Sequence, residues 1–251
     1  MTTVVFPGQG SQYTGMSKDF YDNFNIARVT FQEIEEFTEM NLRKIIFDNK
    51  FNELNITKYT QISIFTSSVI IFKTIQNELD LSPSSIDVMM GHSLGEYSAL
   101  ACSDKLSLKD ASLVLKKRGQ LMNDAVPQNK SGMAALIGKD SNYVQKIIKD
   151  NNINLEVAND NSPKQVVISG DISEIKNNKE LFLKNNIIKY VILNVSAAFH
   201  SKLMLNAQEE LSEIINQVNF NSNKINIISN YNAEVSNNSL SIKKSLQQQM
   251  A

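Results

Sequence analysis

The spacing of apolar residues along the first half of the chain predicts strands and helices in alternation. Residues 2–6 form a short β-branched and aromatic run that stops at Pro7-Gly8-Gln9-Gly10, which predicts a buried strand feeding a glycine-containing loop. Apolar side chains then recur every three or four positions from residue 19 to about 47, which is helix spacing. The remaining elements predicted for this half are a buried helix at 57–79 that breaks at 82–85, a strand at 86–90, a helix from 94 to 102 and a helix at 107–124.

The second half of the chain has shorter elements. The pattern predicts strands at 132–138, 155–158, 165–169 and 187–195, helices at 143–149 and 173–185, and a turn at 159–163. The order β-α-β-β-α-β is typical of a ferredoxin-like split unit. Because a long helix at 203–215 and a strand at 224–229 follow, we expect residues 127–196 to be a small subdomain inserted into a large catalytic subdomain of residues 1–126 and 197–251.

Composition excludes several classes of protein. The 251 residues carry 25 Lys and Arg against 26 Asp and Glu, a net charge of −1, which argues against a nucleic-acid partner. The single cysteine, Cys102, cannot form an internal disulfide. The most apolar segment, residues 62–72, is interrupted by serines and a threonine and is shorter than the roughly 20 residues that span a bilayer. The N-terminus lacks the features of a signal peptide, so we expect a cytoplasmic protein without membrane attachment.

One short motif carries chemistry. Gly91-His92-Ser93-Leu94-Gly95 matches the nucleophile elbow G-x-S-x-G, in which a strained strand-to-helix turn exposes a serine hydroxyl. Backbone N–H groups at the start of the following helix can stabilise an oxyanion. The predicted strand before the motif and the helix after it favour this interpretation. The alternative is a glycine-rich turn that carries a surface serine.

Histidine and arginine are scarce, which narrows the candidates for catalysis and for anion binding. An imidazole base can come only from His92 or His200, and we expect His92, next to Ser93, to have a packing role. A bidentate grip on a carboxylate can come only from Arg28, Arg43 or Arg118. Arg118 follows Lys116 and Lys117 on a predicted helix, so a solvated helix charge is the alternative for it.

Five segments, in order and at compatible spacing, together resemble the malonyl-CoA:acyl-carrier-protein transacylase family over essentially the whole chain. They are Val5 to Gln12, Gly91 to Tyr97, Lys117 to Gly119, Ala158 to Gly170 and Ala198 to Ser201. The resemblance implies an α/β fold, with an α/β-hydrolase-like large subdomain and an inserted ferredoxin-like small subdomain. It also implies transfer of a malonyl group from malonyl-CoA to the phosphopantetheine thiol of acyl carrier protein through a malonyl-serine, supplying fatty-acid synthesis.

The resemblance assigns catalytic roles to matching positions. Ser93 is the nucleophile and His200 its general base, which suits a serine hydroxyl that is a poor nucleophile until a base takes its proton. The family has no acid as third member; a glutamine backbone carbonyl orients the histidine ring, and Gln249 matches that position. Gln9 and Leu94 match the two positions whose N–H groups form the oxyanion hole.

The resemblance also assigns substrate contacts. Arg118 holds the malonyl carboxylate by two parallel hydrogen bonds, and the Phe199 ring crowds an α-methyl branch, which disfavours methylmalonyl. Asn159 and Asn161 match a loop near the pantetheine arm. No metal or organic cofactor is called for, and we expect a monomer whose partners are malonyl-CoA and acyl carrier protein.

Two departures from the family and three alternatives stay open. Ala197-Ala198 differs mildly from the family pattern, and residues 239–251 form a helical pattern without a stop signal where the family continues, so we expect the large subdomain to be incomplete at its C-terminal part. The alternatives are an acyltransferase of a polyketide-type pathway, a serine thioesterase or esterase, and an inactive truncated fragment. An ordinary serine hydrolase would place an acid between serine and histidine, and the nearest candidates, Asp160 and Asp171, lie in the predicted small subdomain.

Overall fold

The computed structural model describes residues 2–82, 85–125, 127, 130–193, 195 and 197–251. The chain forms two compact units, one of Met1–Gln120 with Glu210–Gln249 and the other of Leu121–Glu209 with Met250–Ala251. The subdomain boundaries drawn from the sequence, at 127 and 196, stay a prediction.

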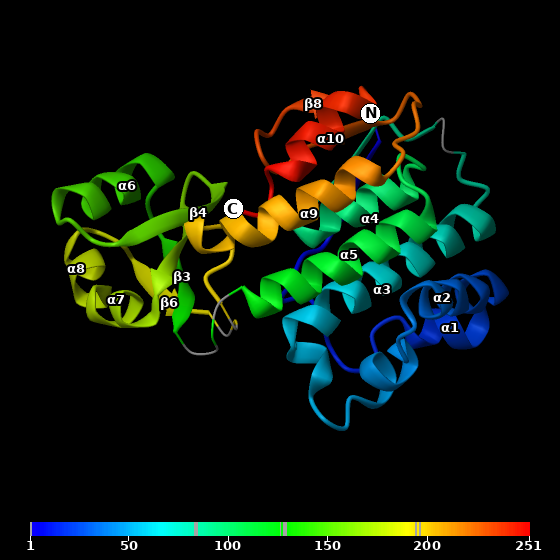
Figure 1. The fold of residues 1–251 in the computed structure, drawn as a ribbon, viewed down its shortest axis with the longest axis horizontal. Helices are drawn as coiled ribbons and strands as arrows, with labels where there is room; N and C mark the ends of the chain where they lie inside the picture. Colours follow the sequence, from blue (N-terminus) through cyan, green and yellow to red (C-terminus); the bar gives the residue numbers. More distant parts are fainter. Residues whose placement is uncertain (1, 83–84, 126, 128–129, 194, 196) are drawn as a thin grey trace. The chain divides into compact units, whose positions relative to one another are not determined.

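The first unit is built on a four-stranded sheet in the order β1-β2-β7-β8, of which Figure 1 labels the edge strand β8. Strands β1 (Thr3–Phe6), β2 (Val88–Gly91) and β7 (Asn226–Ile228) run parallel, and the short β8 (Val235–Ser236), which the sequence pattern did not predict, pairs antiparallel with β7. Because parallel strands end at the same edge, the loops after β1, β2 and β7 meet there. Pairing of Phe6 with Gly91 and of Met90 with Ile228 sets this register.

Helices follow the first two strands of this sheet. In the part of the chain that the structure describes they are α1 (Lys18–Asn23), α2 (Asn25–Thr38), the π-helical η1 (Lys44–Asp48), the 3-10 turn η2 (Glu53–Asn55), α3 (Thr57–Glu78), α4 (Leu94–Cys102) and α5 (Leu108–Asp124). The helical pattern predicted from residue 19 to 47 is divided twice: Phe24 has extended backbone angles (φ −119°, ψ 127°), and α2 ends at Thr38 because Glu39 is left-handed (φ 53°). Later in the chain, after residue 200, come the 3-10 turn η4 (Lys202–Met204), α9 (Leu205–Gln217) and α10 (Ser239–Gln247).

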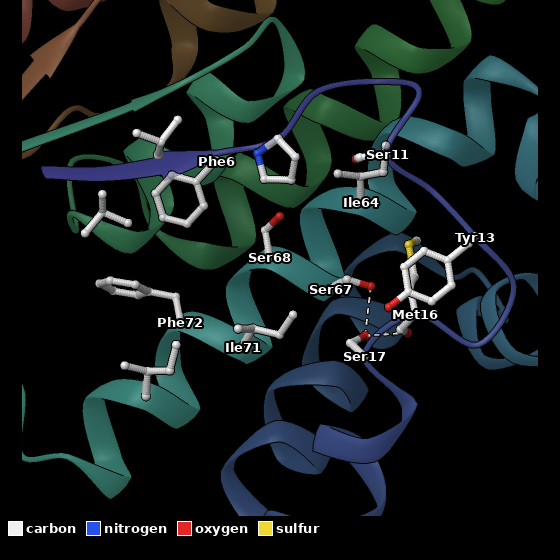
Figure 2. A pocket seen from close by; sticks show the side chains of 14 residues that line it. Phe6, Ser11, Tyr13, Met16, Ser17, Ile64, Ser67, Ser68, Ile71 and Phe72 are labelled. Carbon is white, nitrogen blue, oxygen red and sulfur yellow. Dashed lines mark hydrogen bonds between the residues drawn. The ribbon is translucent and has the colours of Figure 1, made fainter.

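Helix α3 is buried on most of its surface, as its composition predicted. It contacts α2 and α4, and two of its buried threonines, Thr66 and Thr74, donate to carbonyls four residues back in the helix, at 2.8 and 2.7 Å. An apolar cavity of about 300 Å³ lies between α3 and β1, lined among others by Phe6, Ile71 and Phe72 (Figure 2). Of the predicted break after this helix, Pro83 and Ser84 lie outside the described residues.

The second unit is an antiparallel sheet in the order β4-β5-β3-β6, the strand order of a ferredoxin-like unit, which confirms the predicted fold class. Its strands are β3 (Ser131–Ile137), β4 (Leu155–Ser162), β5 (Gln165–Asp171) and β6 (Lys189–Ile192), and its helices are α6 (Ser141–Asp150), α7 (Ile172–Asn177) and α8 (Lys179–Lys184). Side chains from both layers form one core that includes Leu136, Val144 and Phe182.

Two local predictions in this unit were wrong. The turn expected at 159–163 is strand as far as Ser162, because β-bulges let Asn159 and Asp160 continue to pair with β5. The single helix expected at 173–185 is two short helices. They separate at Asn178, whose backbone N–H and side-chain Nδ2 both donate to the Glu174 carbonyl, at 3.1 and 2.9 Å, which ends the first helix there. The predicted strand 187–195 includes Asn194, outside the described residues.

Of the helices in the described ranges, none combines the length and apolar character needed to cross a bilayer.

Candidate active site

Ser93 lies in the sharp turn between β2 and α4. Its backbone angles, φ 52° and ψ −106°, fall in a region that residues other than glycine rarely adopt, and such strain concentrates at functional sites. Leu94 begins α4, so the serine is placed at a helix N-terminus. The strand, the turn and the helix together have the geometry of a nucleophile elbow.

The two glycines of the motif are required by close backbone packing. A Cβ on Gly91 would overlap the backbone of Gly95, and a Cβ on Gly95 would lie 2.6 Å from the carbonyl oxygen of Phe6. Neither neighbour is a flexible side chain, so neither can move aside cheaply. The elbow therefore packs directly against the end of β1.

We expect Gly95→Ala to destabilise the fold by about 3 kcal/mol, since overpacking against backbone costs that order of free energy. Urea unfolding should show a lower midpoint with an unchanged slope. Ser98→Ala on the same helix is the control: its buried hydroxyl has no hydrogen-bond partner among the described residues, so its removal should cost no stability. Equal stability of Gly95→Ala and wild type would contradict the packing argument.

Arg118 on α5 reaches the serine hydroxyl. Its Nη2 donates to Ser93 Oγ at 2.9 Å and to Gln249 Oε1 at 2.9 Å, and its Nη1 donates to Gln61 Oε1 at 2.6 Å. The side chain is 1% exposed, whereas Lys117 next to it pairs with Glu210 at the surface. Arg118 is therefore no solvated helix charge, and the structure brings it together with Ser93 and Gln249.

The guanidinium of Arg118 is desolvated. Burial lowers its pKa, and the nearby Tyr97 and Glu96 oppose that shift electrostatically. Its carbon Cζ lies 5.5 Å from the centre of the Tyr97 ring, and burial raises the pKa of that phenol to about 12. Arg118 Nε is buried with no hydrogen-bond partner in the described part of the chain. A buried cation beside a strained serine is suited to bind an anionic group of a ligand.

A second buried charge, Glu96, lies one turn after the elbow. Its carboxylate accepts from Gln249 Nε2 at 2.6 Å, from Asn230 Nδ2 at 3.0 Å and from Ser229 Oγ at 3.2 Å. Burial raises its pKa, and these hydrogen bonds act in the opposite direction. The Gln249 amide thus bridges the two buried charges, accepting from Arg118 and donating to Glu96.

The remaining predicted residues of the first unit surround the elbow. Leu94 is buried at the first position of α4. Gln9, in the loop after β1, is half-buried, and its Nε2 lies 3.4 Å from Thr57 Oγ1. His92 is exposed, with its imidazole close to Gly8. Its expected packing role stays a prediction.

Four predicted residues belong to the second unit. Phe199 is buried and His200 is half-buried, with a positive φ of 53° that marks a second strained position. The preceding turn is fixed by Ser131 Oγ, which accepts from Ala198 N at 2.9 Å. Asn159 lies in β4 opposite Val167, and Asn161 is exposed at the bulge that follows.

Sequence reasoning missed three polar residues of the site, Gln61, Glu96 and Asn230. Glu96 stood inside the recognised segment, and Asn230 directly follows a predicted strand, the position where side chains of a parallel sheet meet. Either signal could have drawn attention to them. Gln61 could not be told from the other polar residues of α3, such as Thr60 and Ser63, by its sequence position.

The chemistry of this site is that of proteins that pass an acyl group through a serine ester. The family model for the acyl transferase domain matches residues 3–249, and the chain belongs to this family.

The chain is similar in sequence and in structure to several named acyl-transfer proteins. The chain is 36% identical over 250 residues to the malonyl CoA-acyl carrier protein transacylase of Bacillus subtilis strain 168, covering 98% of this chain and 77% of that relative. It resembles the crystal structure of an acyl carrier protein S-malonyltransferase from Vibrio cholerae, with a TM-score of 0.91 and 33% identity over 99% of this chain and 81% of the other. The structure of a malonyl-transacylase in complex with a type II PKS acyl-carrier protein matches with a TM-score of 0.91 and 30% identity. The match covers 99% of this chain and 80% of the other.

Proposed function

We propose that this protein transfers a malonyl group from malonyl-CoA to the phosphopantetheine thiol of an acyl carrier protein. The names of the relatives support this function. The observation that carries it is Arg118, a buried cation whose Nη2 lies 2.9 Å from Ser93 Oγ. The carboxylate and the thioester carbonyl are close together in malonyl-CoA. A carboxylate bound to Arg118 would therefore place the thioester carbonyl of the same malonyl group next to Ser93.

The first half of the proposed reaction acylates Ser93. His200 takes the hydroxyl proton, and the serine oxygen attacks the thioester carbonyl. The N–H groups of Gln9 and Leu94 stabilise the oxyanion. Collapse of this intermediate breaks the carbon–sulfur bond, and coenzyme A leaves with the proton from the imidazolium of His200.

The second half repeats these steps with a different thiol. The phosphopantetheine thiol gives its proton to His200 and attacks the malonyl ester, and Ser93 is released with that proton. Gln249 steadies the imidazole through its backbone carbonyl, Phe199 disfavours branched acyl groups, and Asn159 and Asn161 contact the pantetheine arm. No metal or organic cofactor takes part. We further propose a monomer in the cytoplasm that binds neither nucleic acid nor membrane.

The experiment that tests this function is mass spectrometry of the intact protein after incubation with malonyl-CoA. We expect one covalent malonyl group per chain, and its loss when the carrier protein bearing phosphopantetheine is added, with malonylated carrier protein appearing at the same rate. Malonyl-CoA hydrolysis that is unaffected by carrier protein would instead indicate a thioesterase. Absence of any covalent adduct would overturn the proposal.

A polyketide-type pathway is the second candidate, because one similar structure is a transacylase bound to a type II PKS acyl-carrier protein. Competition between the two kinds of carrier protein for the malonylated enzyme separates the candidates. We expect the carrier protein of fatty-acid synthesis to be malonylated faster; the reverse preference would favour the polyketide role.

A further inference from the structure

The side chain of Asn230, in the loop after β7, holds both ends of the elbow. Its Oδ1 accepts from the backbone N–H of Ser93 at 2.7 Å, and its Nδ2 donates to the carbonyl oxygen of Gly91 at 2.7 Å. One amide therefore ties the last residue of β2 to the first turn of α4, across 137 and 139 positions of sequence. These contacts stabilise the Ser93 conformation, which is unfavourable for the residue alone.

Glu96 in turn fixes Asn230. The carboxylate of Glu96 accepts from the Nδ2 of Asn230 at 3.0 Å and from its backbone N at 3.2 Å. Both oxygens of Glu96 are used, since Ser229 Oγ donates to the other one at 3.2 Å. Glu96 is fully buried, so these bonds are protected from water.

Glu96 also fixes Gln249. The Gln249 Nε2 donates to Glu96 at 2.6 Å and to the Ser93 carbonyl oxygen at 2.9 Å, which leaves Oε1 facing Arg118. A continuous chain of hydrogen bonds therefore runs from the carboxylate to the guanidinium. The Gln249 amide links the buried negative charge to the buried positive charge, and its bonds to both charges fix its orientation.

We propose that Asn230 and Glu96 are positioning residues of the transfer reaction. Asn230 holds the Ser93 hydroxyl in its attacking orientation, and Glu96 holds Asn230 and, through Gln249, the carboxylate-binding guanidinium of Arg118. The inference rests on the proposed function. Neither residue needs to touch the substrate, and each acts through a residue that does.

The two positions should differ in their kinetic signatures. Asn230→Ala leaves Arg118 and its partners in place, so we expect kcat for malonyl transfer to fall about 10- to 100-fold, the order expected for a misplaced reacting group, with KM for malonyl-CoA changed less than about threefold. Glu96→Gln places an amide against the Gln249 amide. We therefore expect it to lower the preference for malonyl-CoA over acetyl-CoA by about tenfold or more.

The test is single-turnover acylation of Ser93 by malonyl-CoA and by acetyl-CoA, with labelling by a fluorophosphonate as a readout of serine reactivity that needs no malonyl group. Asn232→Ala is the matched control for Asn230, because Asn232 lies in the same loop and its side chain bonds Glu234 at the exposed turn, away from the elbow. Thermal unfolding of each variant establishes that it is folded. If Asn230→Ala fails to fold, Asn230→Asp replaces it, because this variant keeps the acceptor for Ser93 N–H and loses the donor. We expect Asn230→Asp to slow fluorophosphonate labelling by a similar factor.

The possible outcomes separate failure of the inference from failure of the proposed function. Slower acylation and slower fluorophosphonate labelling of folded Asn230→Ala, together with reduced malonyl preference of Glu96→Gln, would support the inference. Wild-type rates in both variants, or an equal loss in Asn232→Ala, would overturn it while leaving the malonyl-transfer function intact. If wild-type protein acquires no malonyl group, the function fails, and the inference fails with it.

Discussion

Replacing Ser93 with alanine is expected to reduce malonyl transfer by more than about 10³-fold, because the covalent route is lost with the hydroxyl. No malonyl adduct should form on the intact protein. The fold should survive, since the hydrogen bond that Ser93 Oγ accepts comes from Arg118 Nη2, which also bonds Gln249. We expect a change in unfolding free energy of no more than about 1 kcal/mol.

The control for this prediction is Ser98→Ala, which removes a buried hydroxyl from the same helix, α4, further along the chain from the elbow. It should acylate at the wild-type rate. Retention of the malonyl adduct in Ser93→Ala would place the nucleophile elsewhere and refute the elbow assignment.

Replacing Arg118 with alanine should depress malonyl transfer by about 10²- to 10³-fold and acetyl transfer far less. A bidentate, charge-assisted contact in a desolvated site is lost only for the substrate that has a free carboxylate. Arg118→Lys should recover little, because an ammonium cannot reproduce the two parallel hydrogen bonds of the guanidinium. The measurement is kcat/KM for malonyl-CoA and for acetyl-CoA in each variant.

Lys117→Ala is the matched control, since Lys117 is adjacent on α5 and its ammonium pairs with Glu210 at the surface. It should change neither rate by more than about twofold, as expected for a surface ion pair. Equal losses for malonyl and acetyl transfer in Arg118→Ala would remove the carboxylate-binding role. They would leave Arg118 only its contacts with Gln61, Ser93 and Gln249.

Local patterns predicted most of the secondary structure because each element has its own periodicity. The buried helix α3 and the ferredoxin-like class of the second unit were both correctly predicted. The errors lie where a single residue changes the local path. Phe24 divides the first helical pattern, Asn178 divides another, and bulges extend β4 beyond Ala158. Such breaks depend on backbone angles and side-chain hydrogen bonds that a periodic pattern does not contain.

The sequence alone determined the elbow around Ser93, since its two glycines and its position between strand and helix are local properties of the chain. It also placed Arg118 among only three candidates. The tertiary structure decided which of the residues far apart in sequence surround that serine. Asn230 reaches Ser93 because the parallel strands β2 and β7 end at one edge of the sheet. Gln249 bonds the Ser93 carbonyl oxygen and Gln61 bonds Arg118, because buried amide and charged groups need hydrogen-bond partners.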